Sequence, residues 1–173
     1  MRNKVMLSCV IVLTFGCLAL ALPKPDFNGA WIMDRERSFG MPGNMQQTMT
    51  VSQTADKIEV ETKLIMPDNE RTVKDTYFLD GREYEFAPPV PPNAAPDAPK
   101  PKGKRTANWL PSGDGILVTD VTTTETAKGA VTSQTVRKWT FTGDGELTIA
   151  MFVDGPNGSY EAKRIFTRKK SAV

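Results

Sequence analysis

The most regular feature of this chain is a two-residue alternation of apolar and polar side chains. Over residues 57–66 one face carries Ile58, Val60, Leu64 and Met66, and the opposite face from 57 to 63 carries only Lys and Glu. Over residues 146–153 the apolar face is formed by Leu147, Ile149, Met151 and Val153. A period of two predicts β-strands. Strands that bury one face and expose the other are typical of antiparallel sheets.

Turn-forming residues divide the chain into segments of hairpin length. Asp80-Gly81 and Gly143-Asp144-Gly145 are examples, and the segments between such turns are rich in Val, Ile, Thr and aromatic residues. The chain is therefore expected to be all-β and antiparallel. The expected strands are residues 27–33, 46–54, 57–66, 70–79, 82–87, 104–110, 115–125, 130–141, 146–153 and 159–168. Residues 34–38 lack alternation, and one helical turn is expected there, with Asp34 near its N-terminus.

A proline-rich segment, residues 88–103, interrupts this rhythm. It contains seven of the 13 prolines in the chain. Proline cannot donate to a sheet ladder, so the segment is expected to form an extended loop, partly in the polyproline II conformation. A surface insertion, a lid and a docking arm for a protein partner are the three interpretations.

The N-terminus has the pattern of a secretion signal. A short basic start precedes an almost continuous apolar run over residues 5–22, and the run ends in Ala-x-Ala at 19–21. We predict that residues 1–21 are a signal peptide cleaved after Ala21, and that the protein is secreted or periplasmic. An uncleaved membrane helix and a lipoprotein attached at Cys17 are the alternatives. No membrane span is expected after cleavage.

The remaining residues, 22–173, have the length of one domain. Cleavage would remove both cysteines and two of the 22 basic residues, which leaves 20 basic and 20 acidic residues. This balance gives no case for nucleic-acid binding. The chain contains no histidine, so it cannot build a Ser-His-Asp triad or a His-bearing zinc site. We therefore expect no metal, no cofactor and no enzymatic activity.

The segment after the signal carries a short motif. It reads Phe27-Asn28-Gly29-Ala30-Trp31-Ile32-Met33-Asp34, with Ser38 four residues later. This motif resembles the start of bacterial secreted lipocalin-like proteins and the Gly-x-Trp of lipocalins. The resemblance implies an antiparallel up-and-down β-barrel of about eight to ten strands over residues 22–173. It also implies that Gly29 and Trp31 close one end of the barrel, with Arg164 or Arg168 packed over the indole ring.

Alternation also selects candidate ligand-binding residues on the inner wall. In residues 159–168 it groups Arg164 with Tyr160, Ala162 and Phe166. In residues 130–141 it groups Arg137 with Trp139 and Phe141, and in residues 70–79 it groups Asp75 with Val73, Tyr77 and Leu79. Two alternatives are a bulge that turns these charges outward, and neutralisation of Asp75 by an arginine.

These positions lead to two functional hypotheses. In the first, the barrel binds a small apolar or amphipathic molecule, such as a carboxylic acid, through Arg137, Arg164, Trp139, Tyr77 and Trp109. Those aromatic residues could instead simply form the core. In the second, the core is solid and the protein binds another protein, as an envelope-associated or protease-inhibitor-like barrel would, through the proline-rich segment or through Leu22-Pro23-Lys24-Pro25. A cavity of several hundred cubic ångströms would favour the first.

Overall fold

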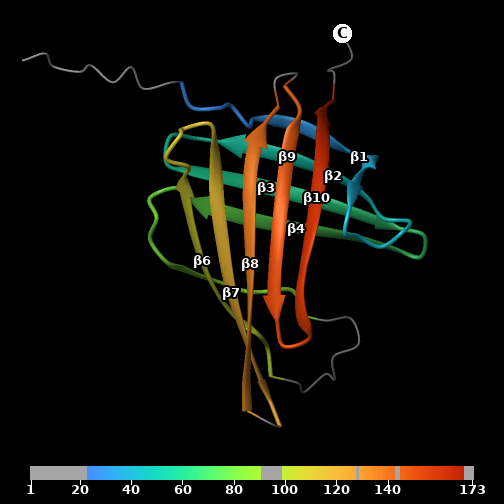
Figure 1. The fold of residues 1–173 in the computed structure, drawn as a ribbon, viewed down its shortest axis with the longest axis vertical. Coiled ribbons are helices and arrows are strands. Elements are labelled where there is room, and N and C mark those ends of the chain that lie inside the picture. Colours follow the sequence, from blue (N-terminus) through green and yellow to red (C-terminus); the bar gives the residue numbers. More distant parts are fainter. Residues whose placement is uncertain (1–22, 91–98, 128, 143–144, 170–173) are drawn as a thin grey trace, which may run out of the picture.

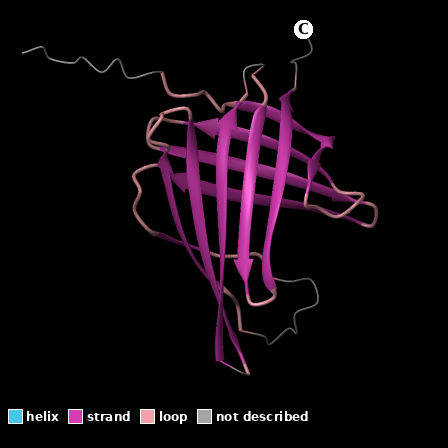
Figure 2. Ribbon diagram, in the orientation of Figure 1, coloured by secondary structure: helices cyan, strands magenta, loops and turns pink. Residues whose placement is uncertain are grey.

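The structure is a computed structural model that describes residues 23–90, 99–127, 129–142 and 145–169. The predicted signal peptide and residues 91–98 of the proline-rich segment lie outside the described residues. All regular structure in the described part is β (Figure 2). The strands are β1 (Gly29–Phe39), β2 (Gln46–Gln53), β3 (Lys57–Met66), β4 (Asn69–Phe78), β5 (Tyr84–Phe86), β6 (Lys102–Trp109), β7 (Gly115–Thr126), β8 (Gly129–Phe141), β9 (Leu147–Gly155) and β10 (Gly158–Arg168).

The ten strands form one antiparallel sheet with the order β4-β3-β2-β1-β10-β9-β8-β7-β6-β5. Consecutive strands pair as hairpins, and β1 pairs with β10, so that the first strand meets the last. In Figure 1 the half made of β1–β4 runs across the half made of β6–β10, and the sheet curls so that the two halves face each other. The predicted fold class, an antiparallel up-and-down barrel of about eight to ten strands, is confirmed.

The barrel is not closed all the way round. No ladder joins β4 to β5, so these strands are the two edges of the sheet. We call the line where β4 approaches β5 and β6 the seam. The sequence does not reveal this opening, because alternation assigns faces to a strand and not neighbours.

The hydrophobic core fills one end of the space between the two halves. Alternation puts the inward side chains of every strand into this space. The largest fully buried side chains are Trp31, Trp139, Phe27, Phe166, Ile58, Ile116, Leu147 and Val118. Phe27 lies before the first strand, and its ring stacks on Phe141 at 5.1 Å between ring centroids. The segment before β1 therefore belongs to the core.

The helical turn expected at residues 34–38 is wrong, because this segment continues β1. The pairing of β1 with β10 shifts register between Asp34 and Phe39, which indicates a bulge. Asp34 accepts hydrogen bonds from the backbone and side chain of Arg37. The Ser38 hydroxyl accepts a hydrogen bond from the backbone N–H of Ile165, in place of a ladder bond. These side-chain bonds hold the extra residues without a helix.

Residues 88–90 and 99–101 of the proline-rich segment form neither strand nor helix. Strand β6 begins at Lys102, two residues inside the range expected to be a loop. Pro88 is buried, whereas Val90 is exposed. Within the described ranges, no helix is long and apolar enough to cross a bilayer.

Candidate functional site

The seam is held together by a few contacts. At one end, Asp80 and Asn108 form an isolated β-bridge, and the Gly81 N–H donates to the Ala107 carbonyl at 3.0 Å. Further along, the Arg105 side chain of β6 reaches across to Asp75 of β4, with an Nη1–Oδ1 distance of 2.8 Å. Beyond Asp75, β4 continues as an unpaired edge toward Asn69. The sheet is therefore joined at one end of the seam and open at the other.

Arg105 is the central residue of the seam. It is buried, and its guanidinium carbon lies 4.8 Å from the centre of the Tyr77 ring and 4.2 Å from that of Phe86. A cation between two aromatic rings is favourable when it is shielded from water. Arg105 therefore fixes β5 and β4 relative to β6.

Asp120 of β7 supplies most of the negative charge at this point. It accepts hydrogen bonds from Arg105 Nε at 2.6 Å and Nη2 at 2.9 Å, and from Arg137 Nη1 at 2.6 Å. Burial alone would raise the pKa of this carboxyl. The hydrogen bond from Arg105 and the charges of Arg137 and Arg105 outweigh burial, and the pKa of Asp120 lies below its ordinary value. Asp120 is therefore held in its ionised form.

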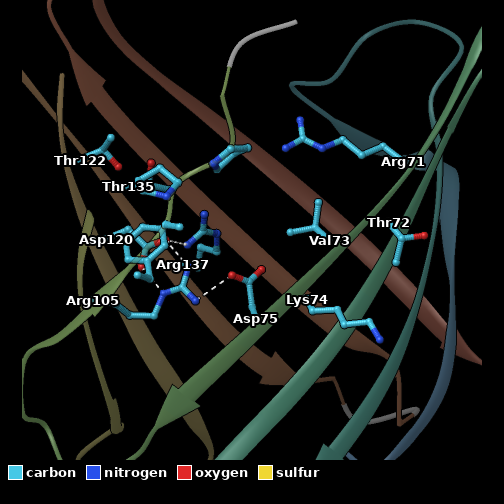
Figure 3. A pocket seen from close by; sticks show the side chains of 14 residues that line it. Arg71, Thr72, Val73, Lys74, Asp75, Arg105, Asp120, Thr122, Thr135 and Arg137 are labelled. Carbon is cyan, nitrogen blue, oxygen red and sulfur yellow. Dashed lines mark hydrogen bonds and ion pairs between the residues drawn. The ribbon is translucent and has the colours of Figure 1, made fainter. Parts of the chain in front are cut away.

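A pocket of about 500 Å³ opens at the seam next to this cluster. In Figure 3, Arg71, Val73 and Asp75 of β4 point toward Arg105, Asp120 and Arg137, whereas Thr72 and Lys74 point away. Residues 86–89, which include Phe86 and Pro88, complete the lining together with Thr122 and Thr135. The lining of the pocket thus combines apolar side chains with three arginines, Arg71, Arg105 and Arg137.

Two of the predicted inner-wall residues, Arg137 and Arg164, carry positive charge that is not fully neutralised. Arg137 lines the pocket, and the one hydrogen bond of its side chain within the described ranges is the one to Asp120. Arg164 lies two strands away on the same face and donates from Nη1 to Gln47 Oε1 at 2.8 Å. The Nε of Arg164 is buried and has no hydrogen-bond partner in the part of the chain that the structure describes. Burial and the nearby charge of Arg137 lower the pKa of Arg164.

The charges that face the interior do not balance. Four arginines, Arg71, Arg105, Arg137 and Arg164, face two carboxylates, Asp75 and Asp120, so these six side chains carry a formal charge of +2. Asp75 and Asp120 both bind Arg105, and Asp120 also binds Arg137. No carboxylate of the described chain forms an ion pair with Arg164 or Arg71.

The three aromatic candidates, Trp139, Tyr77 and Trp109, lie in or against the core and do not line the pocket. Trp139 is 2% exposed, and its Nε1 has no hydrogen-bond partner among the described residues. Tyr77 packs edge-on against Trp139, and its burial raises its pKa to about 12. Trp109 stacks on Phe27 at 6.4 Å, with Lys24 Nζ 4.6 Å from the ring centre.

The predicted barrel-closing residues meet at the filled end. Trp31 is fully buried and donates from Nε1 to the Phe27 carbonyl at 2.9 Å. The Arg168 guanidinium carbon lies 4.8 Å from the centre of the Trp31 ring, and Arg168 also donates to the Asp26 carbonyl. Gly29 has a φ of 124°, which side chains rarely tolerate, and it lies under Arg168.

Sequence reasoning missed Arg105, Arg71 and the role of Asp120. A signal was present in each case, because residues two apart on a strand point to the same face. Arg105 therefore shares a face with Ala107, and Arg71 shares a face with Val73. Asp120 likewise shares a face with Val118. Tyr160 is on the same face of β10 as Arg164, but it lies near the start of the strand and its side chain is 56% exposed.

Within the described residues, no cluster of three or more acidic, Cys or His side chains could hold a metal ion. No protein-family model matches the chain, and no curated protein matches it at a significant level. A solved structure of zebrafish ileal bile acid-binding protein in complex with cholic acid is similar, with a TM-score of 0.45 and 14% identity. The alignment covers 83% of this chain and 98% of that chain. Similarity at this level carries no statement about the ligand or the function.

Proposed function

We propose that the protein binds a small amphipathic anion between the two halves of the curled sheet. The anionic group lies in the pocket next to Arg137, where Arg71 and Arg164 add positive charge, and the apolar part packs against the lining of the pocket. The observation that carries this proposal is the excess of positive charge in the interior. A buried guanidinium without an anion is costly, and a carboxylate or similar group offsets this cost.

The open part of the interior supports ligand binding over the alternative of a solid protein-binding barrel. A volume of about 500 Å³ lies within the range of about 300–1,000 Å³ that is typical of small-molecule sites. The filled end of the barrel provides rigid support for this pocket, because the aromatic core fixes the strands on which the arginines lie.

Binding is a better account of this site than catalysis. Asp120, which accepts three charge-assisted hydrogen bonds, is a poor proton donor because its pKa is lowered. Asp75 is engaged by Arg105. We also propose that binding takes place outside the cytoplasm, on the basis of the predicted signal peptide.

A pair of probes tests the proposal on residues 22–173. 8-Anilinonaphthalene-1-sulfonate is an amphipathic anion, and N-phenyl-1-naphthylamine is a similar molecule without the charge. We expect the anion to bind at one site, and Arg164→Met to weaken its binding about tenfold, since the variant removes one of the positive charges near the pocket. Arg35→Met, at an exposed position of β1, is the matched control and is expected to change affinity less than twofold.

Two results would contradict the proposal. One is equal affinity of the wild type and Arg164→Met for the anion. The other is the absence of saturable binding of any amphipathic anion to a protein that gives a native circular dichroism spectrum.

A further inference from the structure

Donors that are free to bind a ligand approach the pocket from three strands. Arg71 enters from β4, Thr122 from β7, and Arg137 and Thr135 from β8 (Figure 3). Over the described ranges, the side chains of Arg71, Thr122 and Thr135 make no hydrogen bond, and Arg137 makes one, to Asp120. Several donors therefore face the same space without an acceptor.

Both carboxylates of the pocket already bind arginines. Asp75 accepts from Arg105, and Asp120 accepts from both Arg105 and Arg137. A ligand group that meets the remaining donors must therefore bring its own acceptor oxygens. Arg71 and the two threonines lie on opposite sides of the pocket, so these oxygens must point in different directions.

We infer that the ligand carries a tetrahedral oxyanion, as in a phosphate or sulfate ester, rather than a carboxylate. This inference rests on the proposed function and names the class of its ligand. A carboxylate offers two oxygens in one plane, which suits a single guanidinium fork. A tetrahedral oxyanion directs three oxygens outward, one toward Arg71, one toward Arg137 and one toward the Thr122 and Thr135 hydroxyls. The inward-facing arginines of the pocket exceed its two carboxylates by one, and Arg164, two strands from Arg137, adds a second positive charge, so that a dianionic phosphate monoester would offset both.

Four ligands with the same tail separate the headgroup chemistries. Octyl phosphate, octyl sulfate, octanoate and octan-1-ol are titrated into residues 22–173 by isothermal titration calorimetry. We expect both tetrahedral esters to bind about tenfold more tightly than octanoate, because each has one more charge-assisted hydrogen bond available. Octan-1-ol is expected to bind most weakly.

Two isosteric variants assign this preference to the pocket. Thr135→Val and Thr122→Val each remove a hydroxyl and keep the shape of the side chain. Each is expected to weaken binding of the tetrahedral esters about fivefold to tenfold, the loss of one hydrogen bond to a charged group, and to change octanoate less than twofold. Thr123→Val is the matched control, because Thr123 is the next residue on β7 and faces the opposite side of the sheet. Thermal unfolding of each variant shows that it is folded.

The pH dependence of binding distinguishes a phosphate ester from a sulfate ester. The second ionisation of a phosphate monoester has a pKa of about 6, so octyl phosphate is expected to bind more tightly at pH 7.5 than at pH 5, whereas octyl sulfate is expected to bind equally. Binding of octyl phosphate that is no tighter at pH 7.5 than at pH 5 would overturn the match to a dianion.

The inference would be overturned, and the proposed function left intact, if octanoate bound as tightly as the two tetrahedral esters or more tightly, and Thr135→Val did not change the affinity for those esters. Failure of all three anions to bind would overturn the proposed function itself.

Discussion

Replacing Asp120 with asparagine tests whether the charge cluster supports the open side of the barrel. The Asp120 side chain is 5% exposed and the Arg105 side chain 6%. The substitution keeps the shape of the side chain and removes the one negative charge that both Arg105 and Arg137 contact. Removing one partner of a buried ion pair costs about 3–5 kcal/mol, since the remaining charge is buried without compensation. We expect D120N to lower the free energy of unfolding by this amount.

The assay is urea denaturation followed by fluorescence of the three tryptophans. E61Q is the control, because Glu61 pairs with Lys74 at an exposed position and such pairs contribute about 0–1 kcal/mol. D75N is the second variant in case D120N does not fold. Asp75 makes one hydrogen bond to Arg105 and its side chain is 24% exposed, so a smaller loss of about 1–2 kcal/mol is expected.

The pH dependence of the same variant gives an independent result. The pKa of Asp120 is lowered in the folded state, so the unfolded state, with a pKa of about 3.9, binds the proton more readily. The stabilisation is therefore present above pH 4 and is lost as the pH falls through the lower, folded pKa. D120N is expected to lose less stability than the wild type between pH 4 and pH 2. A cost of D120N no larger than that of E61Q, with an unchanged acid profile, would refute this reasoning.

Three further predictions concern the core, the seam and the N-terminus. Phe27→Ala is expected to lower the free energy of unfolding by about 3–5 kcal/mol, because a fully buried ring is lost, whereas Phe152→Ala, at an exposed position, is expected to be close to neutral in the same denaturation experiment. Gly103→Ala would put a Cβ into the space of the Phe86 ring, so a cost of about 1–3 kcal/mol is expected, and a second substitution, Phe86→Ala, should remove most of that cost. Intact-mass analysis of protein exported by its own host is expected to give a chain that starts directly after Ala21, and a retained N-terminus or a lipid on Cys17 would contradict this.

The positions of the strands could be predicted because each depends on local information. Alternation in 57–66 requires one buried and one exposed face, and the turn residues on both sides limit its length. The bulge at residues 34–38 could not be predicted in this way. It depends on Ser38 bonding to Ile165, a residue distant in the sequence.

The candidate site could be predicted in part for the same reason. Alternation along each strand predicted that Arg137 and Arg164 lie on the apolar face, and both side chains do lie between the two halves of the sheet. Alternation does not predict which strands remain unpaired. The seam, the contact of Arg105 with Asp75 and the position of Arg71 depend on how the strands of the sheet are ordered.

The most direct measurement of the central claim is an arginine Nε–H NMR titration of the ¹⁵N-labelled protein with octyl phosphate. The account predicts saturable shifts of the Arg71, Arg137 and Arg164 signals, which are assigned by single Arg→Met variants, and no shift at the exposed Arg35. Shifts confined to exposed arginines, or no saturable shift of any arginine signal, would contradict it.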